Sequence, residues 1–541
     1  MPGVGGCLKG PFGRTDSEGS ALGGQGSVPF APAGSFPYYS SFSANPGIKR
    51  LRRIRLKDSQ NRQEERLKPV PEDPGRVPWV RFSVPLALGA VLWFVPAPPG
   101  VEPAGMRLLA IFIATILGVI LKPLPMGAVA MVGIAASAVT GTLQIEQALS
   151  GFANRVIWLI VLAFFISRGF IKTGLGARIA YLFMALLGRK SLGLGYGLVA
   201  TDLVLAPAIP SNTARAGGVV FPILRSVAEA YDSRPDDGTA RRIGAFLTVV
   251  AFQGTVITSA MFLTAMAANP LAAELASGQG IEITWVGWMV AALVPGLLSL
   301  VAVPWLLYRL FPPEVRETPK ARALAREHLQ ALGPMARPEW IMLGCFGLLI
   351  GLWVLAGPLG IHTTTTALLG LVVLLVTGVL SWSDVLEETG AWDTLVWFSA
   401  LVMMASFLTE FGLIPWFSGA VGNLFGGYGW VGAFLGLSLV YFYSHYFFAS
   451  NTAHVSAMYA PFLGVALVVG TPPILAALVL GFFSNLFSSM THYGTGPAPV
   501  LFGAGYVDVS DWWRLGFVVS LANLVIWVGA GSLWWKFLGL W

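Results

Sequence analysis

Two short polar motifs, each enclosed by long apolar stretches, contain the residues best suited to chemistry. The first reads Ser-Asn-Thr-Ala-Arg at 211–215, and the second reads Ser-Asn-Thr-Ala-His at 450–454. Ser and Thr hydroxyls both donate and accept hydrogen bonds, and the Asn amide adds two donors. Where a helix begins directly after such a motif, its free N–H groups and positive dipole end attract an anion. The residue types therefore predict anion binding at each motif.

The two motifs belong to a repeated arrangement. Trp158 and Trp397 are separated by the same number of residues as the two motifs, and so are Pro222 and Pro461. Helix capping by Ser would explain a single motif of this kind. Two copies at matched positions favour a binding role, in which the motifs together hold both carboxylates of a dicarboxylate. The expected substrate-binding residues are Ser211, Asn212, Thr213, Ser450, Asn451 and Thr452.

An ionisable residue follows each motif, two positions after its threonine: Arg215 in the first copy and His454 in the second. Ionisable residues at membrane depth are energetically costly and usually functional. A dicarboxylate brings about two negative charges, which either sodium ions or these two side chains could balance. The structural alternatives are an arginine that snorkels to the interface and a neutral, hydrogen-bonded histidine. Arg215 and His454 are therefore candidates for charge compensation in place of sodium.

Two further apolar stretches are interrupted by small and polar residues, at 258–270 and 488–497. Each lies C-terminal to one of the motifs, so both are expected to complete the site. His492 is equally well explained as a structural histidine, and Asp202 receives no role. The additional candidates are Thr264, Asn269, His492 and Thr495.

The composition indicates a membrane protein. Of the 541 residues, 55% are hydrophobic and 11% are charged, and the mean hydropathy is +0.70. Soluble chains have about 25% charged residues. The two cysteines, Cys7 and Cys345, suggest neither a disulfide framework nor a metal site. The net charge of +7 comes mainly from the N-terminal segment and a central loop, and it indicates topology rather than nucleic-acid binding. No nucleotide or metal motif is found, so no cofactor and no metal are expected.

A transmembrane helix needs about 20 apolar residues. By this measure the sequence predicts an all-α polytopic fold with about 11 transmembrane helices and two re-entrant hairpins. Hairpins are expected because polar, non-helical backbone at membrane depth must face protein or water. The predicted spans are 82–98, 106–121, 125–143, 152–187, 243–270, 284–308, 340–357, 363–381, 391–413, 472–500 and 512–538.

The distribution of Lys and Arg predicts the topology, because these residues favour the cytoplasmic side. Basic residues follow the fourth span, the first hairpin and the sixth span, whereas the expected outside connections, including 414–428, have none. The two halves then have opposite orientations, as in an inverted repeat with a site at the midplane. The predicted order is an N-terminal extension 1–80, a first repeat 81–308 with an inside hairpin 191–231, a cytoplasmic connecting loop 309–338, and a second repeat 339–541 with an outside hairpin 429–469.

The extension 1–80 admits three interpretations. It is rich in Gly, Ser and Pro and ends in a basic segment. A disordered basic tail, an organellar transit peptide and a mis-assigned start all fit this composition. A bacterial plasma membrane is favoured as the location, with a plastid inner envelope as the alternative.

The motifs resemble those of the divalent anion/sodium symporter (DASS) family. The similar segments are Ser-Asn-Thr-Ala-Arg-Ala-Gly-Gly at 211–218, Tyr-Gly-Thr-Gly at 493–496, and the paired second motif. The resemblance covers about residues 80–541 and is greatest to the exchanger branch, with its citrate/succinate-type antiporters and plastid 2-oxoglutarate/malate translocators. It implies a homodimer, an elevator mechanism, and an Arg and a His in place of sodium at the positions of Arg215 and His454.

The predicted function is sodium-independent antiport of di- or tricarboxylates of the 2-oxoglutarate, malate, succinate and citrate class. The expected partners are these small molecules, the lipid bilayer and a second copy of the chain, but no nucleic acid. A sodium-coupled dicarboxylate symporter is the main alternative, and an anion channel on the same fold is another. A membrane-embedded enzyme would need a nucleophile or paired acids at one depth, which the sequence does not offer, so the chain is not expected to be an enzyme.

Overall fold

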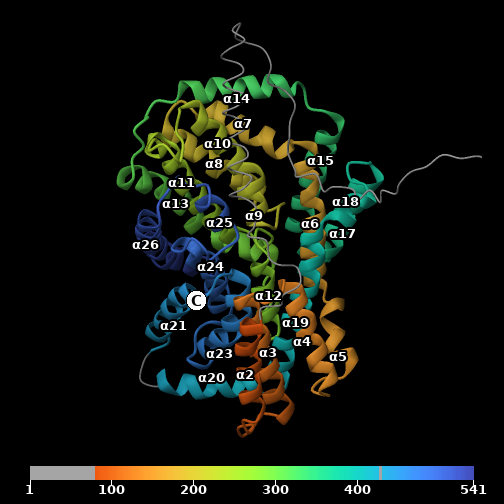
Figure 1. Cartoon of the computed structure of the whole chain (residues 1–541). Helices are drawn as coiled ribbons and strands as arrows, with labels where there is room; N and C mark the ends of the chain where they lie inside the picture. Colours follow the sequence, from red (N-terminus) through yellow and green to blue (C-terminus); the bar gives the residue numbers. More distant parts are fainter. Residues whose placement is uncertain (1–78, 426–428) are drawn as a thin grey trace, which may run out of the picture. The chain divides into compact units, whose positions relative to one another are not determined.

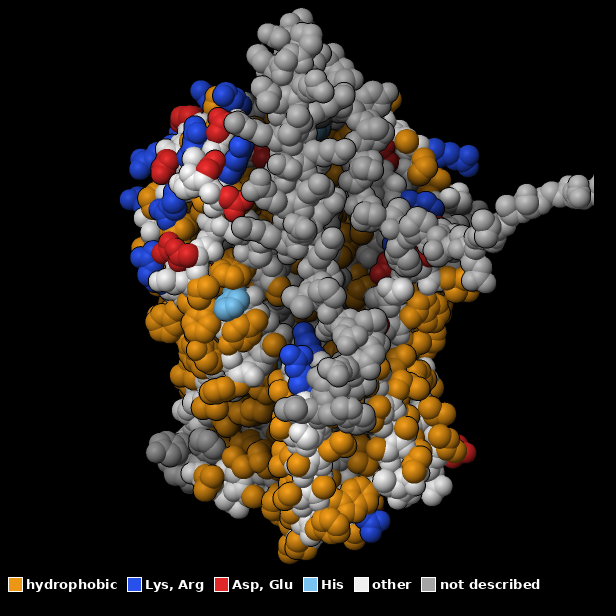
Figure 2. All heavy atoms as spheres, viewed as in Figure 1, with side chains coloured by type: hydrophobic (Ala, Val, Ile, Leu, Met, Phe, Trp, Pro, Cys, Tyr) orange, Lys and Arg blue, Asp and Glu red, His pale blue; other side chains and the backbone are white. Residues whose placement is uncertain are grey.

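The computed structural model describes residues 79–425 and 429–541, and in these residues the secondary structure is helical, without a β-strand. Most of the predicted extension 1–80 therefore lies outside the described residues. The predicted all-α fold is confirmed (Figure 1). Figure 2 shows, on the face in view, apolar side chains over the middle and lower parts and charged side chains gathered in the upper part.

Seven helical segments of the described chain are long and apolar enough to cross a membrane. Shorter apolar helices account for the other four predicted spans, so the expected number of about 11 holds. The central helix α11 is buried along its whole length. The eleven segments are α2 (Trp79–Trp93), α3 (Pro103–Leu121), α4 (Met126–Val139), α6 (Arg155–Thr173), α11 (Gly244–Met261), α13 (Trp285–Leu310), α15 (Arg337–Val354), α17 (Thr363–Val376), α19 (Thr389–Glu410), α24 (Pro473–Leu486) and α26 (Val509–Val525), which continues into α27 (Ser532–Phe537).

The predicted single span 152–187 is wrong, because the chain turns inside it. Helix α6 ends at Gly174, which has φ of +78°, and α7 (Leu175–Leu187) begins after it. Gly412 makes the equivalent turn, with φ of +83°, between α19 and α20 (Leu413–Gly422). Helix α20 thus occupies part of the expected connection 414–428. Glycine adopts positive φ readily, but one glycine within an apolar run is a weak sequence signal.

Each polar motif lies in a helical hairpin. In Figure 1, the first hairpin is in the upper part of the molecule and the second in the lower part. The predicted loop 309–338 contains a helix, α14 (Pro319–Leu332), which packs on α7. The hairpin helices are α8 (Ser191–Leu205), α9 (Asn212–Ala214) and α10 (Phe221–Ala230) in the first, and α21 (Trp430–Ser444), α22 (Asn451–His454) and α23 (Ala460–Val468) in the second.

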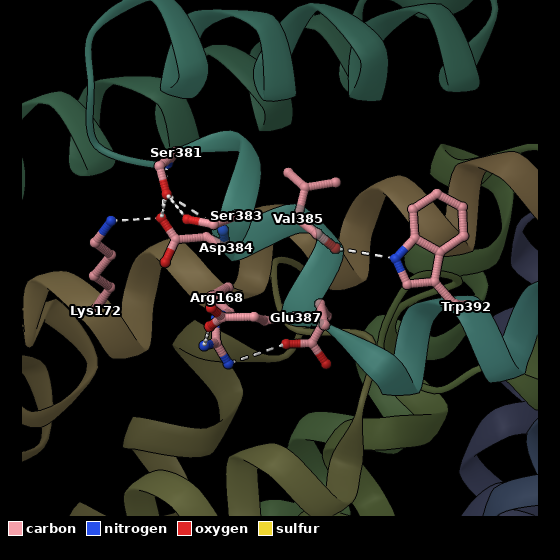
Figure 3. Close-up of polar contacts among 9 residues, drawn as sticks. Arg168, Lys172, Ser381, Ser383, Asp384, Val385, Glu387 and Trp392 are labelled. Atoms are coloured by element: carbon pink, nitrogen blue, oxygen red, sulfur yellow. Dashed lines mark hydrogen bonds and ion pairs between the residues drawn. The ribbon is translucent and has the colours of Figure 1, made fainter. Parts of the chain in front are cut away.

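Ion pairs connect the C-terminal end of α6 to the short helix α18 (Trp382–Glu387), as Figure 3 shows. Lys172 Nζ lies 2.5 Å from Asp384 Oδ2, and Arg168 Nη2 lies 3.3 Å from Glu387 Oε2. Burial of Asp384 raises its pKa, but the hydrogen bonds from Lys172 and Ser381 outweigh this effect and lower the pKa to about 2. The ionised Asp384 carboxylate therefore stabilises the fold.

Replacing Asp384 should lower stability in a pH-dependent way. We expect Asp384→Asn to reduce the free energy of unfolding by about 1 kcal/mol, since a charge-assisted hydrogen bond is lost. A depressed pKa stabilises the fold above the ordinary value near 3.8 and loses this effect as the pH falls towards 2. Thermal unfolding in detergent at pH 7, 5 and 3 measures the difference.

The matched control is Glu387→Gln, because the Glu387 side chain is 65% exposed and its ion pair contributes little. A destabilisation that is equal for both variants, or that grows as the pH falls, would contradict the role of Asp384.

Candidate anion-binding site

The first motif caps a helix and lies against the second half of the chain. Ser211 Oγ accepts the Ala214 N–H at 3.1 Å. Asn212 Nδ2 donates to Thr495 Oγ1 at 3.2 Å. A Cβ atom placed on Gly496 would lie 1.9 Å from Thr213 Oγ1, so these two residues are in direct contact. The expected residues Asn212, Thr213 and Thr495 are therefore brought together.

The second motif contacts the same part of the chain as the first. Ser450 Oγ accepts the Ala453 N–H at 3.4 Å. Asn451 Nδ2 donates to the Ser484 carbonyl at 2.9 Å and to Ser488 Oγ at 2.6 Å. Ser484 belongs to α24, and Ser488 to the turn that follows it. Helix α24 and its C-terminal loop, up to Gly496, thus contact both motifs.

Within each hairpin, a π-helical turn follows the motif directly. The turns are Arg215–Val220 and Val455–Tyr459, and they make the helices continuous from 212 to 230 and from 451 to 468. A proline, Pro222 or Pro461, lies just after each turn. Proline has no N–H for the helix ladder and clashes with the carbonyl four residues earlier. The wider turn accommodates this defect, and such turns are frequent at functional sites. The matched prolines were the sequence signal for this feature.

Two of the additional candidates hold the motifs in position. Thr264 Oγ1 donates to the Pro207 carbonyl at 2.7 Å, just before the first motif. Asn269 Nδ2 donates to the Ser259 carbonyl at 2.8 Å, and its Oδ1 accepts from Asn485 Nδ2 at 2.7 Å. Asn485 lies on α24. Asn269 therefore connects the interrupted span of the first half, at the start of α12 (Ala268–Ser277), to that of the second.

Arg215 is completely buried, and its guanidinium is enclosed by oxygen atoms. Nε donates to Asp202 Oδ1 at 3.0 Å. Nη1 donates to the carbonyls of Ile209 at 2.6 Å and Ala265 at 2.5 Å. Nη2 donates to Ser259 Oγ at 3.0 Å. We call these four acceptors the oxygen cage. It occupies four of the five guanidinium donors, so Arg215 binds the protein rather than facing a ligand.

Asp202, for which no role was predicted, is the charged member of this cage. It is 2% exposed, on the entry arm α8 of the first hairpin. Its second carboxylate oxygen accepts a hydrogen bond from the Thr258 hydroxyl on α11. A lone carboxylate in an apolar arm requires a buried partner. The lone Asp202 in an apolar stretch was thus a sequence signal for a buried ion pair, but no local pattern identified Arg215 as its partner.

His454 is completely buried in a cluster of aromatic rings in the second hairpin. Its Nε2 lies 2.9 Å from Ser444 Oγ, while Nδ1 has no hydrogen-bond partner among the described residues. The ring centroids of Tyr441, Phe448 and Phe487 lie 4.6 to 4.7 Å away. The ring is therefore held by packing and by the contact with Ser444.

A neighbouring histidine that sequence analysis overlooked, His445, connects the second hairpin to the loop after α24. Its Nε2 lies 2.9 Å from the Gly494 carbonyl, and its ring centroid is 5.3 Å from that of His454. Gly494 precedes Thr495, the partner of Asn212. His492, by contrast, accepts from Trp513 Nε1 at 3.0 Å, and its ring lies near those of Tyr493, Phe502 and Trp513, so the structure places it in an aromatic group.

This arrangement of polar hairpin tips enclosed by membrane-spanning helices defines a multi-pass membrane transport protein. A family model described as the sodium:sulfate symporter transmembrane region matches residues 76–541. The chain belongs to this family of divalent anion/sodium symporters, which confirms the resemblance of the motifs. Family membership also identifies the chain as a transporter and not an enzyme.

Curated relatives cover the same region. A protein named putative malate transporter YflS, from Bacillus subtilis, is 56% identical over 463 residues, which are 85% of this chain and 97% of the relative. A protein named dicarboxylate transporter 1, chloroplastic, from Spinacia oleracea, is 53% identical over 472 residues, which are 86% of this chain and 83% of the relative. The family thus includes bacterial and plastid proteins at similar identity.

A solved structure shares the fold. The crystal structure of the Alcanivorax borkumensis YdaH transporter aligns with a TM-score of 0.51, covering 85% of this chain and 97% of that chain. Because the sequence identity is 14%, the likeness concerns the fold alone.

The contact between Gly496 and Thr213 predicts a severe effect of one methyl group. Gly496→Ala places a Cβ 1.9 Å from Thr213 Oγ1, so the first motif must shift. We expect transport by reconstituted protein to fall by about tenfold or more, equivalent to about 1.4 kcal/mol.

The control is Gly347→Ala on α15, where an added Cβ meets nothing within 4 Å. Unchanged transport by a correctly folded Gly496→Ala protein would show that the first motif does not need this contact.

Proposed function

We propose that this chain exchanges dicarboxylates of the malate and 2-oxoglutarate class across a membrane without sodium. The names of its relatives, as malate and dicarboxylate transporters, support the substrate class. The filled oxygen cage around Arg215 supports sodium independence most directly. A homodimer and elevator-type movement, implied by the family resemblance, belong to the same proposal.

The oxygen cage has the composition of a site for a hard cation. Such cations bind carboxylate, carbonyl and hydroxyl oxygens, and Asp202, two backbone carbonyls and Ser259 supply these types. The guanidinium already fills the space between them. A carrier with a permanent cation at this position needs no sodium ion to satisfy these oxygens, and the buried carboxylate has its counter-charge in every state of the transport cycle.

The two motifs supply the donors for the substrate carboxylates. Ser211, Asn212 and Thr213 are half-buried, and so are Ser450 and Thr452, whereas Asn451 is buried. Each motif begins a continuous helix, 212–230 or 451–468. The helix N–H groups therefore add to the side-chain donors. One carboxylate binds at each motif.

Asp202 already neutralises the positive charge of Arg215. The two negative charges of the bound dianion must therefore be compensated by other groups. Each helix N-terminus contributes about +0.5 charge, so the two together supply about +1. The rest would come from a proton that His454 takes up together with the dianion, because burial alone disfavours the charged imidazolium. Without a dianion, the serine caps satisfy one N–H of each helix end and the remaining donors and positive dipole ends lack an anion, which disfavours carrying them through the bilayer on an empty carrier. Movement only when loaded produces obligatory exchange.

The test is uptake of labelled malate into proteoliposomes of the purified full-length chain. We expect uptake at least tenfold faster into vesicles preloaded with 2-oxoglutarate than into empty vesicles, with equal rates in sodium and choline buffers. Matched vesicles without protein provide the control. Sodium-driven uptake into empty vesicles would instead establish the symporter, and uptake without saturation or counterflow would establish a channel.

A further inference from the structure

A narrow apolar groove lies between α2, α3 and α4, away from the two motifs. It has a volume of about 250 Å³. On α2 it extends from Phe82 to Trp93, and Val129, Val132 and Thr140 on or after α4 form the facing wall. At 1.5 Å per residue, this stretch of α2 is about 16 Å long. That length matches one leaflet of a hydrocarbon core about 30 Å thick.

The chemistry of the lining restricts the occupant to hydrocarbon. The two threonines that line the groove use their hydroxyls inside their own helices: Thr115 donates to the Ile111 carbonyl and Thr140 to the Ala136 carbonyl, at 2.8 and 2.7 Å. Two apolar residues of the lining are well exposed: Leu86 is 58% exposed and Val132 is 50% exposed. Among the described residues, the groove lining has no free hydroxyl, its exposed side chains Leu86 and Val132 are apolar, and it lies within membrane-spanning helices, which suits it to a lipid tail.

Two basic residues lie at one end of the groove. Arg81 directly precedes Phe82, and Lys122 directly precedes Pro123, which also lines the groove. Both are exposed, and neither has an acidic partner among the described residues. At the other end, Arg107 packs over the ring of Trp93 at 5.7 Å. The free positive charge at the first end complements a phosphate group.

We propose that this groove binds one acyl chain of an anionic glycerophospholipid, with the phosphate at Arg81 and Lys122. The position connects the lipid to the second motif. Val129, which lines the groove, also packs with Val119 and with Ala453, which lies within the second motif. The lipid tail therefore supports the wall of α3 and α4 against which this motif rests.

The test is photolabelling of the purified full-length chain with phosphatidylglycerol that carries a diazirine in its acyl chain, followed by peptide mapping. We expect labelled peptides from α2 to α4. Ala90→Phe fills the groove, since Ala90 lines it, and should reduce this labelling at least fivefold. Ala87→Phe, on the same helix at an exposed position outside the groove, should leave it unchanged.

The headgroup is tested by the double variant Arg81→Gln with Lys122→Gln. It should lose the preference for photoreactive phosphatidylglycerol over photoreactive phosphatidylcholine, which we expect to be about tenfold in the unmodified chain. Thermal unfolding confirms that each variant is folded. No labelling of α2 to α4 in the unmodified chain, or labelling that Ala90→Phe and Ala87→Phe reduce equally, would overturn the proposal. Failure of exchange in proteoliposomes would leave this result unaffected, because lipid binding is measured directly.

Discussion

The structure depends on satisfying polar groups where helices are interrupted inside an apolar bundle. An unsatisfied polar group in such surroundings costs several kcal/mol. Polar side chains at the interruptions of one half form hydrogen bonds with those of the other half: Asn212 donates to Thr495, and Asn485 donates to Asn269. His445 adds a link to the Gly494 carbonyl. The first motif and the interrupted span that follows it therefore take hydrogen-bond partners from the second half of the chain.

The ion pair between Asp202 and Arg215 follows the same constraint. Removing one member of a buried pair costs about 3–5 kcal/mol, because it leaves an uncompensated charge. Here the pair also joins four pieces of the first half: α8, Ile209 two residues before the motif, the π-helical turn and the interrupted span at Ala265. A cation at this position therefore determines the shape of the first motif. In our account the chain carries that cation as a side chain.

The sequence predicted the features that depend on residue type and spacing. The length of the apolar stretches predicted the helical spans. The repeated Ser-Asn-Thr motifs predicted the candidate site residues, which contact α24 and its C-terminal loop. The prediction of a single span at 152–187 failed because one residue, Gly174, turns the chain between α6 and α7. Contacts set by tertiary packing were also missed, because nothing local pairs Asp202 with Arg215 or His445 with Gly494. Sequence left two interpretations of His492 open, substrate binding and a structural role, and its hydrogen bond from Trp513 favours the structural one.

The most direct measurement of the central claim is malate exchange by an Arg215→Ser protein across a series of sodium concentrations, with choline as the replacement cation. Our account predicts that exchange is lost in choline and recovers in part as sodium enters the vacated oxygen cage, while Arg215→Lys and the exposed-site control Arg225→Ser remain independent of sodium. A folded Arg215→Ser protein whose exchange is the same in sodium and in choline would contradict the claim that Arg215 takes the place of a sodium ion.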